Sequence, residues 1–107
     1  MIDASKSISK KVLGLTAIVD TQIPLSGEIV RITEFKYQAN PNQDTHVRLV
    51  WDYLGLSEEI LAIGYGTGTT PICIEVVGDG TKILAIVVQN DSGGAEYLGG
   101  GYTALKS

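Results

Sequence analysis

The segment Ile83-Leu84-Ala85-Ile86-Val87-Val88 sets the fold class of this chain, because it is an unbroken run of six apolar residues. Six residues are too few for a typical helix, so the run predicts a β-strand that is apolar on both faces. A strand of that kind has to be covered on both sides. In a chain of 107 residues, this indicates either a core strand of a β-sandwich or a strand covered by a neighbouring subunit.

The rest of the chain also has the pattern of an all-β protein, with apolar residues at alternate positions and turn formers between the runs. The expected strands are 12–19, 28–37, 46–53, 60–65, 72–77, 82–89 and 96–105. We therefore predict one domain over residues 12–107, an antiparallel β-sandwich of about seven or eight strands, with a jelly roll as one fitting topology. Residues 1–11 have no core-forming pattern and predict an extended N-terminal arm.

Strand 28–37 contains an irregularity in its alternation. Val30 and Ile32 have one parity, whereas Phe35 and Tyr37 have the other. One extra residue in a strand reverses which face the following side chains occupy, so we expect a β-bulge near Thr33.

Two turn-rich segments predict connections between strands, and one run of glycines predicts an irregularity inside a strand. The turn-rich loop 39–44 predicts a hairpin between strands 28–37 and 46–53, and the segment 77–81 predicts a second, tight hairpin. Gly99-Gly100-Gly101 lies inside the last strand, which predicts a bend or a close approach of another backbone.

Charge is distributed unevenly along the chain, whose formal net charge is −4. The low content of Lys and Arg argues against nucleic acid as a partner. Lys6, Lys10 and Lys11 lie in the arm, whereas residues 51–107 hold two lysines and seven acids. A basic arm on an acidic body predicts docking of the arm to an acidic neighbour. The alternative is that Lys10 and Lys11 only solubilise the start of an exposed strand.

Cellular location is constrained by what the sequence lacks. The single cysteine, Cys73, cannot form an internal disulfide, and its apolar neighbours predict a small buried side chain. No apolar run approaches the ~18 residues that cross a bilayer, and the N-terminus has no signal-peptide pattern. We expect no membrane partner, and a location in the cytoplasm or in a virion assembled there.

Catalytic, metal-binding and phosphate-binding patterns are absent from the sequence. The single histidine, His46, has the polar parity of its strand and predicts a solvated side chain rather than a catalytic base. His46 and Cys73 are too few for a zinc site. The glycines of Gly64-x-Gly66-x-Gly68 are followed by neither a lysine nor a helix, so they predict no phosphate loop. We expect no enzyme, no cofactor and no bound metal.

Aromatic residues at or near strand ends are the one group with a functional character. Such rings stack on sugars, and they are also enriched where subunits meet. Trp51 shares the parity of Val47 and Leu49 and predicts a core position.

Together these patterns predict a non-enzymatic assembly subunit. The expected partners are further copies of the chain, in a homo-oligomer such as a trimer, and a larger protein shell with a capsid, cement, decoration or spike role. The residues predicted to dock or to lie at interfaces are Lys6, Lys10, Lys11, Tyr65, Tyr97 and Tyr102. The alternative is a carbohydrate-binding or adhesin module, whose predicted sugar-binding residues are Trp51, Tyr53, Tyr65 and Tyr97.

Overall fold

The computed structural model describes residues 1–40 and 44–107, which form nine strands and no helix. The strands are β1 (Ile2–Asp3), β2 (Lys6–Val12), β3 (Thr16–Gln22), β4 (Ile29–Gln38), β5 (Thr45–Trp51), β6 (Glu59–Gly64), β7 (Thr67–Val77), β8 (Leu84–Asn90) and β9 (Glu96–Lys106). Since no described segment is helical, none can cross a membrane as a helix.

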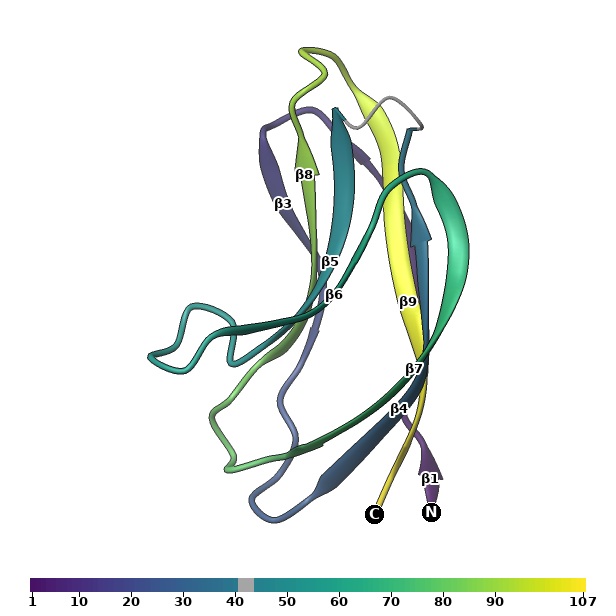
Figure 1. Ribbon diagram of the computed structural model, residues 1–107. Coiled ribbons are helices and arrows are strands. Elements are labelled where there is room, and N and C mark those ends of the chain that lie inside the picture. The colour runs from purple at the N-terminus through teal and green to yellow at the C-terminus, as the bar shows by residue number, and fades with distance from the viewer. Residues whose placement is uncertain (41–43) are drawn as a thin grey trace.

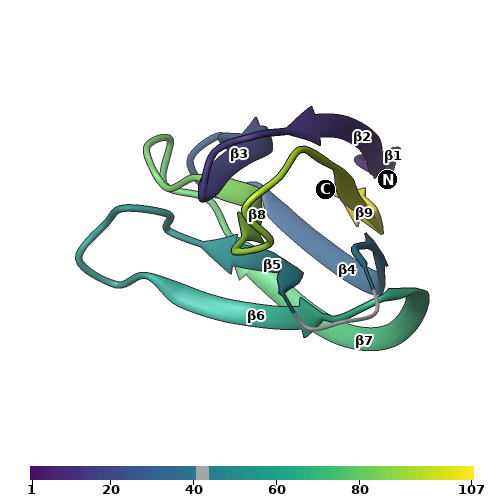
Figure 2. The ribbon, with the colours of Figure 1, turned by 90° about the horizontal axis from the view of Figure 1, so that it is seen from above.

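Two antiparallel sheets pack face to face (Figures 1 and 2). One sheet has the order β2-β9-β4-β7, with β1 also paired to β9, and the other has the order β3-β8-β5-β6. From β2 to β5 each strand lies in the opposite sheet from the one before it, and the same holds from β6 to β9. This connectivity is that of a jelly roll. The predicted antiparallel β-sandwich is therefore confirmed.

Both predicted hairpins are wrong. β4 and β7 lie in one sheet, whereas β5 and β8, the strands that follow them, lie in the other. The connections 39–44 and 78–83 therefore cross between sheets; residues 41–43 of the first lie outside the described residues. Facing sheets are only ~10 Å apart, so a short turn-rich segment fits a crossing as well as a hairpin.

The predicted strand 12–19 is also wrong, because it joins the end of β2 to the start of β3 across a turn. Its apolar alternation continues through the turn in Leu13 and Leu15, but these side chains are 77% and 67% exposed.

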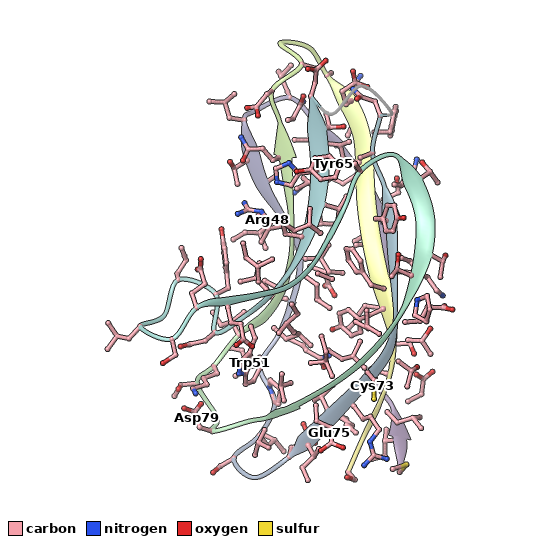
Figure 3. The ribbon with its side chains drawn as sticks, in the orientation of Figure 1. Arg48, Trp51, Tyr65, Cys73, Glu75 and Asp79 are labelled. Atoms are coloured by element: carbon pink, nitrogen blue, oxygen red, sulfur yellow. The ribbon has the colours of Figure 1, made fainter. Side chains whose placement is uncertain are left out.

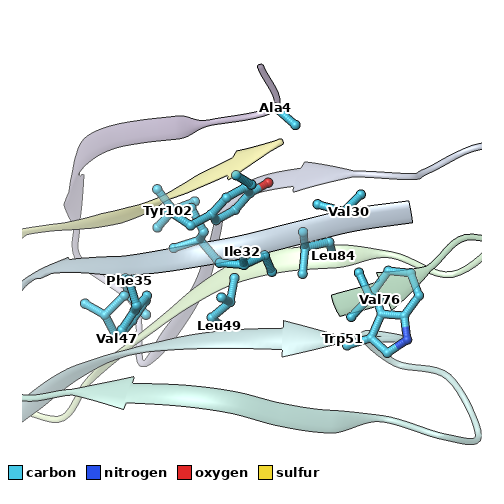
Figure 4. Close-up of a cluster of buried hydrophobic side chains, with 14 of the residues drawn as sticks. Ala4, Val30, Ile32, Phe35, Val47, Leu49, Trp51, Val76, Leu84 and Tyr102 are labelled. Carbon is cyan, nitrogen blue, oxygen red and sulfur yellow. The ribbon is translucent and has the colours of Figure 1, made fainter. Parts of the chain in front are cut away.

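The core lies between the sheets and contains one side of β8. Leu84, Ile86 and Val88 are fully buried there, facing side chains such as Ile32 of β4 (Figure 4). Ala85 and Val87 lie on the other side of β8 and are also fully buried. The strand is thus covered on both faces, as its sequence predicts.

The predicted bulge in β4 is confirmed. Ile32 faces Ala104 of β9, yet Glu34, two residues further on, faces the very next residue, Thr103. The extra residue brings Phe35 onto the same buried side as Ile32, with 1% and 0% exposure.

The glycines of β9 permit a close approach of β2, the edge strand formed by most of the predicted arm. A Cβ atom at Gly99 or Gly101 would overlap the backbone of Ile8 or Lys6. The predicted close backbone approach is therefore confirmed, and residues 6–12 pair with β9 along the edge of the sheet. Gly64 and Gly68 similarly leave room for the ring of Tyr37, which gives the glycine motif a packing role.

Candidate interaction surface

The outer face of the β2-β9-β4-β7 sheet carries charges that are already paired. Arg31 of β4 and Glu75 of β7 form an ion pair of 2.9 Å. Glu34 lies 4.0 Å from the ammonium group of Lys36 and accepts a hydrogen bond of 3.3 Å from the Thr103 hydroxyl. The same face also exposes Val77 and Leu105, at 56% and 42%, so it combines paired charges with apolar side chains.

The outer face of the β3-β8-β5-β6 sheet has an apolar part beside a polar row formed by Thr16, Gln89 and His46. Strand register places the apolar part in two further rows across the four strands. One row is Ile18, Val87, Arg48 and Ile63, and the next is Thr21, Ala85, Val50 and Ile60. We call these eight residues the apolar face. Val50, Ala85 and Val87 at its centre are at most 1% exposed, whereas Ile18, Ile60 and Ile63 at its sides are 43–48% exposed. The isoleucines thus offer apolar area to solvent.

Arg48 is the one cation of the apolar face (Figure 3). Its Nε atom is buried and has no hydrogen-bond partner among the described residues, and no ion pair found among them includes it. A buried N–H without an acceptor is unfavourable. Arg48 as a whole is half-buried, so its positive charge, rather than the buried Nε, is what another molecule can meet.

His46 lies beside Arg48 on the same outer side of β5. Its ring contacts that of Tyr65, with centroids 5.4 Å apart. Partial burial lowers the pKa of His46, the positive charge of Arg48 lowers it further, and the carboxylate of Asp91 opposes the change.

The loop between β5 and β6, residues 52–58, projects from the sandwich (Figure 1). We call it the projecting loop. Leu54 and Leu56 are 78% and 107% exposed in it. Asp52 accepts hydrogen bonds from the backbone N–H groups of Gly55 and Ser57, at 2.8 and 3.0 Å. Glu58 accepts another from the Leu54 N–H at 2.6 Å.

Two residues of the projecting loop have a left-handed backbone. Asp52 and Leu54 have φ of 55° and 63°, which is uncommon for residues other than glycine. Such conformations persist where surrounding contacts hold them in place. The hydrogen bonds of Asp52 and Glu58 supply those contacts, so the loop presents its leucines in a defined arrangement.

The residues predicted to dock or to lie at interfaces differ in their exposure in the structure. Lys10 and Lys11 are exposed on β2, and Lys6 is half-buried. Tyr65 and Tyr97 are 52% and 65% exposed.

Tyr102 is buried, with 1% exposure, so its prediction as an interface residue is corrected. Its hydroxyl accepts a hydrogen bond of 2.6 Å from Gln22 across the sandwich, and burial raises its pKa. Tyr102 shares the inward parity of Ala104.

The four aromatics of the carbohydrate alternative do not form one exposed platform. Trp51 is a core residue with 9% exposure, and Tyr53 is half-buried against Val50 and its neighbours. Only Tyr65 and Tyr97 of this set are exposed.

Cys73 is exposed, so the prediction that it is buried is wrong. β7 is an edge strand whose inward parity belongs to Ile72 and Ile74, which pack against the core. Cys73 lies between them and therefore points outward.

A shallow groove of about 270 Å³ lies above Gly100, on the outer side of the sheet that contains β9. Its lining residues are Ser7, Ile8, Ser9, Lys36, Tyr37, Gln38, Thr67 and Gly100. The described part of the chain contains no group of three His, Cys, Asp or Glu residues that could hold a metal ion.

The fold and this surface define a jelly-roll sandwich whose outer faces combine polar and apolar side chains, with a projecting loop that exposes two leucines. Comparison of the sequence with models of known protein families finds no match, and comparison with curated proteins finds no significant one. No sequence pattern singles out Arg48, Leu54 and Leu56, which the structure places on the surface described above. The signal that could have found Arg48 is its shared parity with Val50 on a strand beside the apolar β8.

Proposed function

We propose that the protein is a non-enzymatic assembly subunit that self-associates and forms part of a larger protein shell, such as a virion, in a capsid, decoration or spike role. The observation that carries this proposal is the apolar face together with the projecting loop. Ile18, Ile60 and Ile63 at the sides of this face and Leu54 and Leu56 in the loop are all exposed, and exposed apolar side chains gathered on a small domain favour an interaction site.

The dimensions of the molecule support the proposal. A standard protein interface buries ~800 Å² on each partner. The molecule measures 41 × 26 × 18 Å, so each broad side of the sandwich is large enough for a contact of that size.

The arm contributes a second, electrostatic contact in this proposal. Lys10 and Lys11 are exposed on the outermost strand, where they can approach an acidic neighbour. The test is Lys10→Glu with Lys11→Glu, which reverses the charge and keeps β2 in place. Loss of docking to the shell supports this role, and unchanged docking contradicts it.

The oligomeric state tests the proposed function directly. Analytical ultracentrifugation of the full chain, from micromolar to near-millimolar concentration, is expected to show a discrete oligomer in reversible equilibrium with the monomer. A strict monomer over the whole range would contradict self-association.

Carbohydrate binding is a second candidate, and the groove above Gly100 favours it. Its lining includes the hydroxyl, amide and ammonium groups of Ser7, Ser9, Gln38 and Lys36, which are suited to sugar hydroxyls. Binding on a glycan array that Gln38→Ala weakens would support this function. An array without response would leave the assembly role as the better proposal.

A further inference from the structure

We propose that the apolar face of one copy receives the projecting loop of a second copy, with Leu54 and Leu56 packed against Ile18, Ile60 and Ile63. This inference rests on the proposed assembly function and identifies the surface that it uses.

The first argument is that the leucines of the loop and the isoleucines at the sides of the apolar face are exposed in the single chain. Leu54 and Leu56 touch almost nothing of their own molecule, with exposures of 78% and 107%. The projecting loop extends from the two strands β5 and β6 of the same sheet that bears the apolar face (Figure 1). Since the loop does not fold back onto its own sheet, a second copy is needed to bring leucines and isoleucines together.

The second argument is charge complementarity. The apolar face carries Arg48, with its unpartnered Nε. The projecting loop carries Asp52 and Glu58, and Glu59 follows it as the first residue of β6. The acidic residues of the loop complement the positive charge of Arg48. The leucines of the loop complement the isoleucines of the apolar face. One chain thus contains both halves of the contact, which favours a second copy as the occupant.

The third argument is pre-organisation. The loop is held by the hydrogen bonds that Asp52 and Glu58 accept. Ordering a loop upon association opposes binding, and a loop that is already ordered avoids most of that loss.

The test is the double variant Leu54→Asn with Leu56→Asn, studied by sedimentation velocity. Asparagine tolerates the left-handed backbone of Leu54, so the loop is expected to keep its shape. Self-association is expected to weaken about tenfold or more, as for the loss of central interface residues. The matched control is Leu13→Asn with Leu15→Asn, which removes two leucines of similar exposure (77% and 67%) from the turn after β2. This control is expected to associate like the wild type.

The face is tested by Arg48→Glu, which would place a negative charge opposite the acidic loop. It is expected to weaken association more than the uncharged variant Arg48→Met does. Circular dichroism melting of each variant establishes that it is folded.

The outcomes separate this inference from the proposed function. A wild-type chain that never associates overturns both. A wild type that associates while the Leu54/Leu56 variant associates equally well overturns the inference alone. Equal loss in the Leu13/Leu15 control also overturns it, because general surface hydrophobicity would then explain the association.

Discussion

Tyr102 shows how one side chain joins the two sheets. Its ring lies in the core, and its hydroxyl, on β9, accepts a hydrogen bond from Gln22 at the end of β3 in the opposite sheet. Because the ring packs on all sides and only the hydroxyl meets a polar group, the residue combines apolar burial with a polar link between the sheets.

Tyr102→Phe is expected to lower the free energy of unfolding by about 1 kcal/mol, the net value of one neutral hydrogen bond. The ring and its packing remain, so the change isolates the hydroxyl. Urea denaturation followed by tryptophan fluorescence measures it. Tyr97→Phe, at a position 65% exposed, is the control and should leave stability unchanged. An unaltered midpoint in Tyr102→Phe would show that the bond to Gln22 contributes nothing.

His46 gives the protein a pH dependence whose sign follows from its environment. Its folded-state pKa lies below the ordinary imidazole value of 6.5, so the unfolded chain binds the proton more readily. The folded state is therefore favoured above the unfolded pKa, and that contribution is lost as the pH falls through the folded pKa. Arg48 and Asp91 are the charged groups that act on His46.

His46→Gln is expected to reduce the fall in melting temperature between about pH 7.5 and pH 5. Glutamine does not titrate, so only the contribution of this residue is removed. Differential scanning calorimetry at both pH values provides the measurement. If wild type and variant lose the same number of degrees, His46 does not contribute to the pH dependence.

At the scale of the strand, the bulge in β4 determines which side chains reach the core. If the same residues alternated without a bulge, Phe35 and Tyr37 would have the parity of the outer face. β4 pairs with β9 on one side and β7 on the other, so its register affects three of the strands of one sheet.

Deletion of Arg31, in the regular part of β4, is expected to destabilise the protein by several kcal/mol, because it moves the buried Val30 to the outer parity or makes the strand slip. Deletion of Thr33 is expected to cost less, because it removes the extra residue and leaves Ile32, Glu34 and Phe35 alternating regularly opposite Ala104, Thr103 and Tyr102. Chemical denaturation and the dispersion of an amide NMR spectrum report both effects. Arg31→Ala is the control for the lost ion pair with Glu75. A Thr33 deletion as damaging as the Arg31 deletion would contradict this account of the bulge.

At the scale of the whole molecule, the N-terminal residues are part of the sandwich. Ala4 and Val12 are 7% and 3% exposed and belong to the main core, and β2 covers the edge of β9. A segment with no core-forming pattern of its own is thus held by strand pairing.

Removal of residues 1–12 is expected to lower the melting temperature and to cause aggregation, because it exposes the edge of β9. Light scattering during a thermal melt records both effects. Lys10→Glu with Lys11→Glu is the control that retains β2 and should melt like the wild type. A truncated chain that stays monodisperse with an unchanged melting temperature would contradict a structural role for β2.

Much of the fold follows from local patterns in the sequence. The double-sided burial of β8, the bulge at Thr33 and the close approach at Gly99 and Gly101 all depend on strand periodicity or on the absence of a Cβ atom. Both properties act between neighbouring residues or neighbouring strands, so the amino-acid order is enough to predict them.

The pairing of strands and the character of each surface depend on the fold as a whole. The same turn residues connect strands within a sheet or between sheets, so the crossing loops 39–44 and 78–83 read as hairpins in the sequence. Alternation along a strand divides its side chains between two faces of the sheet, but it does not show which face becomes the core. For this reason the sequence predicts a buried Cys73, which is exposed, and an interface position for Tyr102, which is buried. The apolar face also exists only because β3, β8, β5 and β6 are adjacent, since side chains from four distant segments form it once the sheet has assembled.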